Sequence, residues 1–189
     1  MTLKNTMHRW GPVAQFLHWL IVALVITQVT LATLADDLPA SMKKLTLMSR
    51  HKSIGITVLM LVVLRLLWRW RNPIPDLPPP VKPFERRLAR AAHALFYVLL
   101  IAIPITGWLM SSARGFSVSW FGLFQLPDLV SKSKPLYLML MDTHDTLAWT
   151  LVGLAGLHAA AALRHHFMLR DDVLRRMLPF TDSARNRRP

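Results

Sequence analysis

The chain has 189 residues, of which 53% are apolar and only 17% charged, and it contains no cysteine. This composition is too apolar for an ordinary soluble domain and indicates an integral membrane protein. The lack of cysteine excludes disulfides, iron–sulfur clusters and thioether-linked haem, so any cofactor must be held by other side chains. The net charge of +13 comes from basic residues that flank apolar segments. Such residues are typical determinants of membrane topology and do not indicate nucleic-acid binding.

Four long apolar segments predict four transmembrane helices, because about 20 residues are needed to cross a hydrocarbon core of roughly 30 Å. We expect an all-α, integral membrane four-helix bundle that forms a single domain over residues 1–180, followed by a basic cytoplasmic tail at 181–189. The expected spans cover about 13–35, 51–70, 91–113 and 143–163. The second helix could begin as early as Ser41, a potential N-cap, and the fourth after Pro135.

The connections between the spans predict the topology. Residues 71–83 are rich in proline and form an extended linker. Residues 115–127 carry several aromatic side chains, which predicts an interfacial segment along the bilayer surface. Lysine and arginine concentrate near the ends of the spans in the second connection and after the fourth span. We therefore expect both termini in the cytoplasm.

Four histidines lie inside or at the ends of the apolar segments, where an ionisable ring is costly and marks a functional candidate. His18 and His158 fall near the cytoplasmic ends of the first and fourth spans, and His51 and His144 near the outer ends of the second and fourth. His144 and His158 are 14 residues apart. This spacing places them within about 40° of one helix face and roughly 21 Å apart along the axis. The fourth helix therefore offers one ligand to each of two levels.

Small residues lie beside these histidines, namely Gly55 one turn after His51, and Gly11 and Ala14 before His18. We interpret them as room for a flat cofactor. Paired histidines without cysteine or carboxylate clusters suit axial ligation of a b-type haem, since zinc or copper prefers three or four ligands. For any one histidine, the alternative is a hydrogen-bonded ring between helices or in the headgroup region.

Four further histidines lie near the cytoplasmic ends of the spans, namely His8, His93, His165 and His166. His93 and His165 are alternative ligands at the inner level, although an interfacial position is favoured for both. His93 could also bind a haem propionate or a quinone oxygen. The roles of His93, His165 and His166 stay open at this point.

From about His18 to Pro179 the chain resembles the four-helix bacterial cytochrome b561 proteins. The matching motifs are residues 16–19 (FLHW), 50–55 (RHKSIG), 143–148 (THDTLA) and 156–166 (GLHAAAALRHH). The resemblance implies two b haems, with His18 and His158 as axial iron ligands of the inner haem and His51 and His144 as those of the outer haem. It also implies the bacterial inner membrane and single-electron transfer to or from the ubiquinone pool. In some members, superoxide is oxidised at the outer surface with ubiquinone as acceptor.

Basic residues are candidates for two further roles. Those on the outer loops could draw an anion toward the outer haem, although they could equally be solvated loop charges. They are Lys43, Lys44, Arg50, Lys52, Arg114, Lys132 and Lys134. The candidate contacts to haem propionates are Arg9, Arg50, Lys52 and Arg90.

Two other functions fit the sequence. The chain could be the haem-bearing membrane anchor of a larger dehydrogenase or hydrogenase, with a soluble electron-donor subunit as partner. It could also be a haem-free membrane protein that handles metal ions or scaffolds a partner, for which Met139, Met141 and His144 come nearest to a metal-binding cluster.

Overall fold

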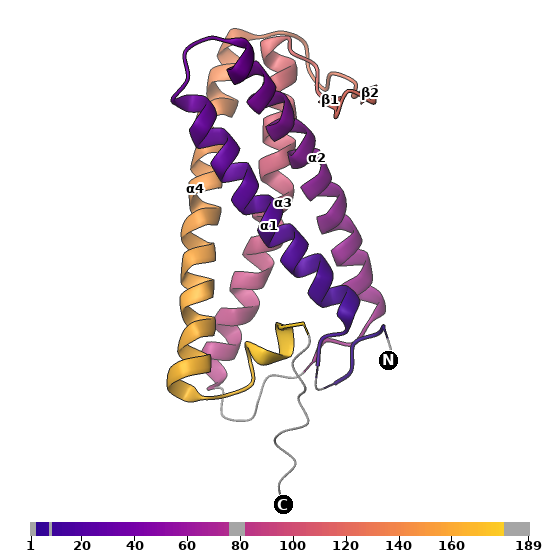
Figure 1. The fold of residues 1–189 in the computed structure, drawn as a ribbon, viewed down its shortest axis with the longest axis vertical. Coiled ribbons are helices and arrows are strands. Elements are labelled where there is room, and N and C mark those ends of the chain that lie inside the picture. The colour runs from indigo at the N-terminus through magenta and orange to yellow at the C-terminus, as the bar shows by residue number, and fades with distance from the viewer. Residues whose placement is uncertain (1–2, 8, 76–81, 180–189) are drawn as a thin grey trace, which may run out of the picture. The chain divides into compact units, whose positions relative to one another are not determined.

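The computed structural model describes residues 3–7, 9–75 and 82–179 (Figure 1). Its elements in chain order are α1 (Pro12–Asp36), α2 (Met42–Arg71), α3 (Pro83–Arg114), β1 (Ser119–Trp120), β2 (Phe124–Gln125), α4 (Lys134–Arg164), the π-helical turn η1 (His165–Leu169) and the 3-10 turn η2 (Arg175–Met177). Within the described residues, four helices are long and apolar enough to cross a membrane. This confirms the expected all-α membrane fold. The predicted basic tail at 181–189 and residues 76–81 of the proline-rich linker lie outside the described part of the chain.

The helices extend beyond the apolar spans because polar caps and prolines set their ends. Ser41 caps α2, since its Oγ accepts a hydrogen bond from the backbone N–H of Lys44 at 3.3 Å. Pro12 and Pro83 stand at the first positions of α1 and α3, where the missing N–H of proline has no intrahelical partner to lose. Gly115, with φ +83°, ends α3 in the left-handed conformation that favours glycine.

The structure divides into two compact units, and each contains part of all four long helices. Unit 1 consists of Met1–Leu20, Leu64–Phe96 and Val152–Pro189, and unit 2 of Ile21–Val63 and Tyr97–Leu151. His18, His93 and His158 belong to unit 1, whereas His51 and His144 belong to unit 2. The histidines of unit 1 are those that the sequence predicts at the cytoplasmic ends of the spans, and the histidines of unit 2 are those that it predicts at the outer ends.

In unit 1, the segment before α1 is fixed against its neighbours by Asn5. The Asn5 side chain accepts a hydrogen bond from the N–H of Gly11 at 2.9 Å and donates one to the carbonyl of Pro73 at 3.0 Å. A Cβ atom on Gly11 would lie 2.6 Å from the carbonyl oxygen of Leu3. Gly11 thus allows a close approach of two backbones, and its interpretation as room for a cofactor is wrong.

In unit 2, β1 and β2 form a short antiparallel hairpin beside α2 (Figure 1). Its turn has Phe121 at φ 50° and Gly122 at φ 76°, the positive pair of a tight hairpin turn. The hydroxyl of Ser53, which is 1% exposed, donates to the carbonyl of Ser119 and accepts from the N–H of Phe121, both at 3.0 Å. The aromatic segment expected at the bilayer surface is therefore a hairpin attached to α2.

Large apolar side chains on the helices face outward. Phe16, Val98 and Leu157 are 65%, 61% and 72% exposed. Such exposure is costly in water, whereas hydrocarbon chains solvate these side chains well and the helices satisfy their own backbone hydrogen bonds. The surface of the long helices thus fits a lipid environment.

Candidate functional site

The histidine pair of unit 2 has the more defined geometry. α2 supplies His51 and α4 supplies His144, and the two half-buried rings have centroids 6.3 Å apart with an interplanar angle of 72°. A metal–imidazole bond is about 2 Å long and the ring nitrogen lies about 1 Å from the ring centre, so two rings that bind one ion from opposite sides have centres roughly 6 Å apart. The separation therefore fits one metal ion between the rings.

Backbone carbonyls orient both rings. The Nδ1 of His51 lies 3.2 Å from the carbonyl oxygen of Gln28 on α1, and the Nδ1 of His144 lies 3.0 Å from that of Ile103 on α3. A carbonyl oxygen only accepts, so each Nδ1 must carry the proton and donate. Each Nε2 then has its lone pair available, and the described residues offer it no hydrogen-bond donor. Metal-ligating histidines in proteins are typically held in this way.

Three residues around this pair carry no signature that a sequence pattern would reveal. The hydroxyl of Thr106 donates to the Ile103 carbonyl at 2.9 Å and lies 3.2 Å from the Nδ1 of His144. Gly107 lies directly against the His144 ring, since a Cβ there would be 3.0 Å from Cε1. Gln28 lies beside Gly55, and its Oε1 is buried without a hydrogen-bond partner in the described structure.

The donor set fits a haem better than a bare metal ion. Among the described residues, no group of three or more histidine, cysteine or acidic side chains could hold a metal ion. Two neutral imidazoles are the nitrogen donors that would hold the iron of a haem b. His51 and His144 are thus the residues of unit 2 that would hold a haem b.

Unit 1 contains three histidines in one cluster. The ring of His158 packs edge to face against His93 and Phe96 of α3, with centroids 5.6 and 5.3 Å away. The ring of His18 packs against Trp19 at 5.3 Å and lies close enough to His93 and His158 to interact with both electrostatically. The structure thus brings the predicted pair together with His93, the alternative that the sequence left open, and their ligand roles stay predictions.

An arginine enters this cluster from α2. The guanidinium Nη1 of Arg65 donates to the carbonyl of Ala14 at 2.8 Å, and its charge acts on His18 and His93. Arg65 lies inside the expected span 51–70, where a charge that faced lipid would be costly. Its side chain instead reaches across to α1, beside the histidines.

The predicted cationic residues of unit 2 fall into two groups. Lys52 and Arg114 lie over the ring of Phe116, 5.8 and 5.6 Å from its centroid, and Arg114 also lies 5.1 Å from that of Tyr137. Lys132 joins this cluster through its side chain, which lies beside Gly115. The others, which are Lys43, Lys44, Arg50 and Lys134, show no contact with this cluster among the described residues.

The two candidate propionate contacts of unit 1 are Arg9 and Arg90. Arg90 is exposed on α3, and Arg9 is half-buried in the loop before α1. The described structure shows no contact from either arginine to His18 or His158.

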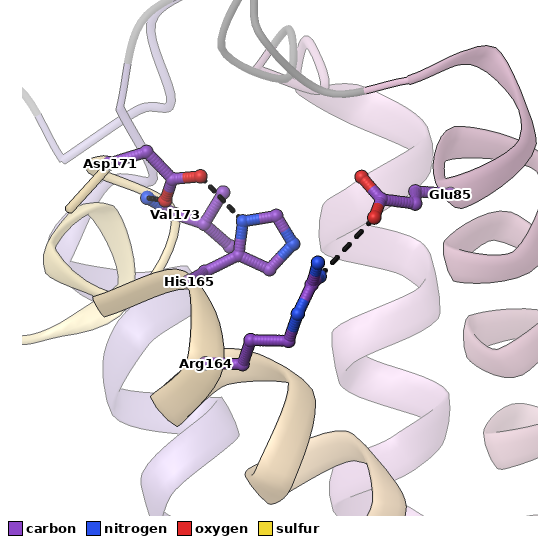
Figure 2. A network of polar contacts seen from close by, with 5 residues as sticks. All are labelled: Glu85, Arg164, His165, Asp171 and Val173. Atoms are coloured by element: carbon purple, nitrogen blue, oxygen red, sulfur yellow. Dashed lines mark hydrogen bonds and ion pairs between the residues drawn. The ribbon is translucent and has the colours of Figure 1, made fainter. Parts of the chain in front are cut away.

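His165 belongs to a separate polar network at the end of α4 (Figure 2). Its Nδ1 lies 2.5 Å from the Asp171 carboxylate, whose other oxygen accepts from the N–H of Val173 at 3.0 Å. Both side chains are largely buried, at 13% and 7% exposure. Next to them, Arg164 pairs with Glu85 of α3 at 3.2 Å. This network closes the end of α4 and holds the chain that follows it.

The four apolar helices and the oriented imidazole pair define a multi-pass membrane protein with a site suited to a bis-imidazole metal cofactor. Residues 9–180 match the family model described as prokaryotic cytochrome b561. The chain therefore belongs to the prokaryotic cytochrome b561 family. It is a membrane haem protein of electron transfer, and its four helices fit a bacterial inner membrane.

Individual relatives agree with this assignment. The chain is 38% identical over 185 residues to cytochrome b561 homolog 2 of Escherichia coli strain K12, covering 94% of this chain and 95% of the relative. It is 37% identical over 163 residues to the probable superoxide oxidase CybB of Yersinia pestis, covering 86% and 92%. It is 28% identical over 176 residues to cytochrome b561 homolog 1 of E. coli K12, covering 92% and 98%.

Proposed function

We propose that the chain is a di-haem b cytochrome that transfers single electrons to or from the ubiquinone pool. It oxidises superoxide at the outer surface and uses ubiquinone as the acceptor. The observation that carries the proposal is the His51–His144 pair, with ring centroids 6.3 Å apart and both Nδ1 atoms turned toward carbonyls. The name of the Yersinia pestis relative supports superoxide as the substrate.

Each unit holds one haem in this proposal. His51 and His144 ligate it in unit 2, and His18 and His158 in unit 1, where His93 packs against the His158 ring and does not ligate. Haem b, when bound, supplies one-electron oxidation and reduction. The protein orients the imidazoles, excludes water with apolar side chains and places charge near the ligands.

The cations of unit 2 serve the substrate. Lys52 directly follows His51 in α2, and it shares the Phe116 ring with Arg114. A concentration of positive charge raises the local concentration of a small anion such as superoxide and speeds its association. Arg50 and Lys52 are the proposed propionate partners in unit 2, and Arg9 and Arg90 those in unit 1.

The membrane orientation is inferred from charge. The connection between α2 and α3 and the segment after α4 are rich in lysine and arginine near the helix ends. The positive-inside rule then places both termini in the cytoplasm and the hairpin side of unit 2 outside. A cysteine introduced in the hairpin of the otherwise cysteine-free chain should react with an impermeant thiol reagent added from outside.

Haem content tests the ligand assignment. Detergent-purified protein should give a b-type reduced-minus-oxidised spectrum with two haems per chain. The variants His51→Ala and His144→Ala should each lose one haem, and His18→Ala and His158→Ala the other. His93→Phe, which keeps a ring against His158, is the matched control and should retain both. Loss of haem in another combination would overturn the pairing.

Reduction of quinone tests the activity. Protein reconstituted in liposomes with ubiquinone should form ubiquinol when superoxide is generated outside. Lys52→Gln should lower the rate and weaken its dependence on ionic strength, whereas Lys43→Gln should have little effect. Haem reduction that requires a co-purifying soluble subunit would instead identify a membrane anchor of a larger complex.

A further inference from the structure

The two histidine clusters differ in what the ligand rings contact. In unit 2, both candidate ligands donate from Nδ1 to a carbonyl, His51 to Gln28 at 3.2 Å and His144 to Ile103 at 3.0 Å. In unit 1, the described residues provide no hydrogen bond to the ring of His18 or His158, which contact aromatic rings instead. A hydrogen bond from the second ring nitrogen makes an imidazole a more basic ligand. A more basic ligand stabilises the oxidised iron.

Charge differs between the clusters as well. In unit 1, the charges of Arg65 and Arg69 act on His93, and that of Arg65 acts also on His18. A positive charge close to a redox centre favours the reduced form, because it attracts the added electron.

The charges that act directly on the two candidate ligand rings of unit 2 are mixed. Asp36 and Lys52 act on His51 with opposite signs, and Asp145 acts on His144. These charges therefore do not favour the reduced form as the arginines of unit 1 do. The hydrogen bonds and the charges therefore both make the reduction potential higher in unit 1 than in unit 2.

We propose that these contacts set an order between the two sites, so that the site of unit 1 has the higher reduction potential and is reduced first. Arg65 raises the potential in unit 1 through its charge. Thr106 is a positioning residue in unit 2, where its hydroxyl shares the Ile103 carbonyl with His144. The inference rests on the proposed function, because it requires one histidine-ligated haem in each unit.

A redox titration of the purified haem-loaded protein, followed by visible absorbance, tests this order. The wild-type chain should titrate in two waves. Arg65→Met removes the charge but keeps an unbranched side chain, and it should shift the higher-potential wave downward while leaving the lower one in place. Arg65→Lys keeps the charge and is the matched control, with a smaller shift. A shift of the lower-potential wave in Arg65→Met, or of neither wave, would overturn the assignment.

A second pair of variants addresses unit 2 independently, in case Arg65→Met fails to fold. Thr106→Val should shift only the lower-potential wave, and Thr106→Ser, which retains the hydroxyl, should titrate as the wild type. A shift confined to the higher-potential wave, or no shift, would contradict the order. Fewer than two haems per chain would refute the proposed function itself, whereas two haems with the reverse order would refute only this inference.

Discussion

The ring of His144 lies directly against Gly107 of α3, where a Cβ atom would be 3.0 Å from Cε1 and 3.3 Å from Nδ1. Gly107→Ala must therefore displace the ring, whose Nδ1 donates the hydrogen bond to the Ile103 carbonyl. We expect the variant to bind the haem proposed for unit 2 more weakly by roughly 10- to 100-fold, the range found when contacts behind a metal ligand are disturbed. Haem per chain in the purified protein measures the effect.

Gly153→Ala on α4 is the control for this variant, because a Cβ at residue 153 would have nothing within 4 Å. It should keep its haem and gain helix stability of up to about 1 kcal/mol, the preference for alanine over glycine inside a helix. Equal loss of haem in the two variants would show that the contact with His144 is not responsible.

Gly11→Ala should destabilise unit 1. The added Cβ would lie 2.6 to 2.7 Å from backbone atoms of Leu3 and Lys4, and backbone cannot rotate away as a side chain can. We expect a loss of about 1–3 kcal/mol in the free energy of unfolding, as for other overpacked sites. Thermal unfolding followed by circular dichroism in detergent measures it. Gly156→Ala, where a Cβ has nothing within 4 Å, should not be destabilised.

Asp171→Ala should loosen the chain after α4. The substitution removes the acceptor of both the His165 ring and the N–H of Val173, and it leaves a largely buried imidazole without its partner. A loss of about 1–3 kcal/mol in the free energy of unfolding is expected for an unsatisfied buried donor. Limited proteolysis after residue 170 should speed up while haem content stays at the wild-type value.

Asp172→Ala serves as the comparison for this change. The Asp172 carboxylate lies 3.8 Å from the Arg175 guanidinium, and both side chains are partly exposed. Such a pair contributes little, so we expect a change below about 1 kcal/mol. If Asp171→Ala lost a haem, His165 would be more than a structural residue.

Ser53→Ala should release the β1–β2 hairpin from α2. One buried hydroxyl binds the Ser119 carbonyl and the Phe121 N–H, so its removal leaves both backbone groups without this partner. We expect faster cleavage by protease at the hairpin turn, in protein that keeps its helical content. Ser117→Ala, which removes an exposed hydrogen bond to Asp128, should leave the cleavage rate unchanged. Equal cleavage of both variants would contradict the role of Ser53.

Apolar length and helix-end residues predicted the four helices well, because crossing a bilayer demands a long uncharged segment. Ser41 and Pro135 also indicated the early starts of α2 and α4. The hairpin was missed because its turn sequence, Phe121-Gly122, lacks the asparagine or aspartate that usually marks such turns.

The site was only partly predictable. The histidines stand out because imidazoles are rare in hydrocarbon, and the spacing of His144 and His158 indicated two levels. The role of Arg65 depends on the packing of α2 against α1 near Ala14, which the sequence alone does not specify. Gly107 likewise matters only because α4 places the ring of His144 against it, and the sequence does not specify this contact.

Two of the groups that orient the histidines of unit 2 are main-chain carbonyls, those of Gln28 and Ile103. Every residue type carries the same carbonyl, so no side-chain substitution at either position deletes these hydrogen bonds. An alanine scan would therefore overlook them, and homologous chains can vary at both positions without losing the support. Helices α1 and α3 carry no candidate ligand in unit 2, and they support its histidines through the positions of their backbone carbonyls. Side-chain substitutions in these helices over evolution therefore leave that support in place.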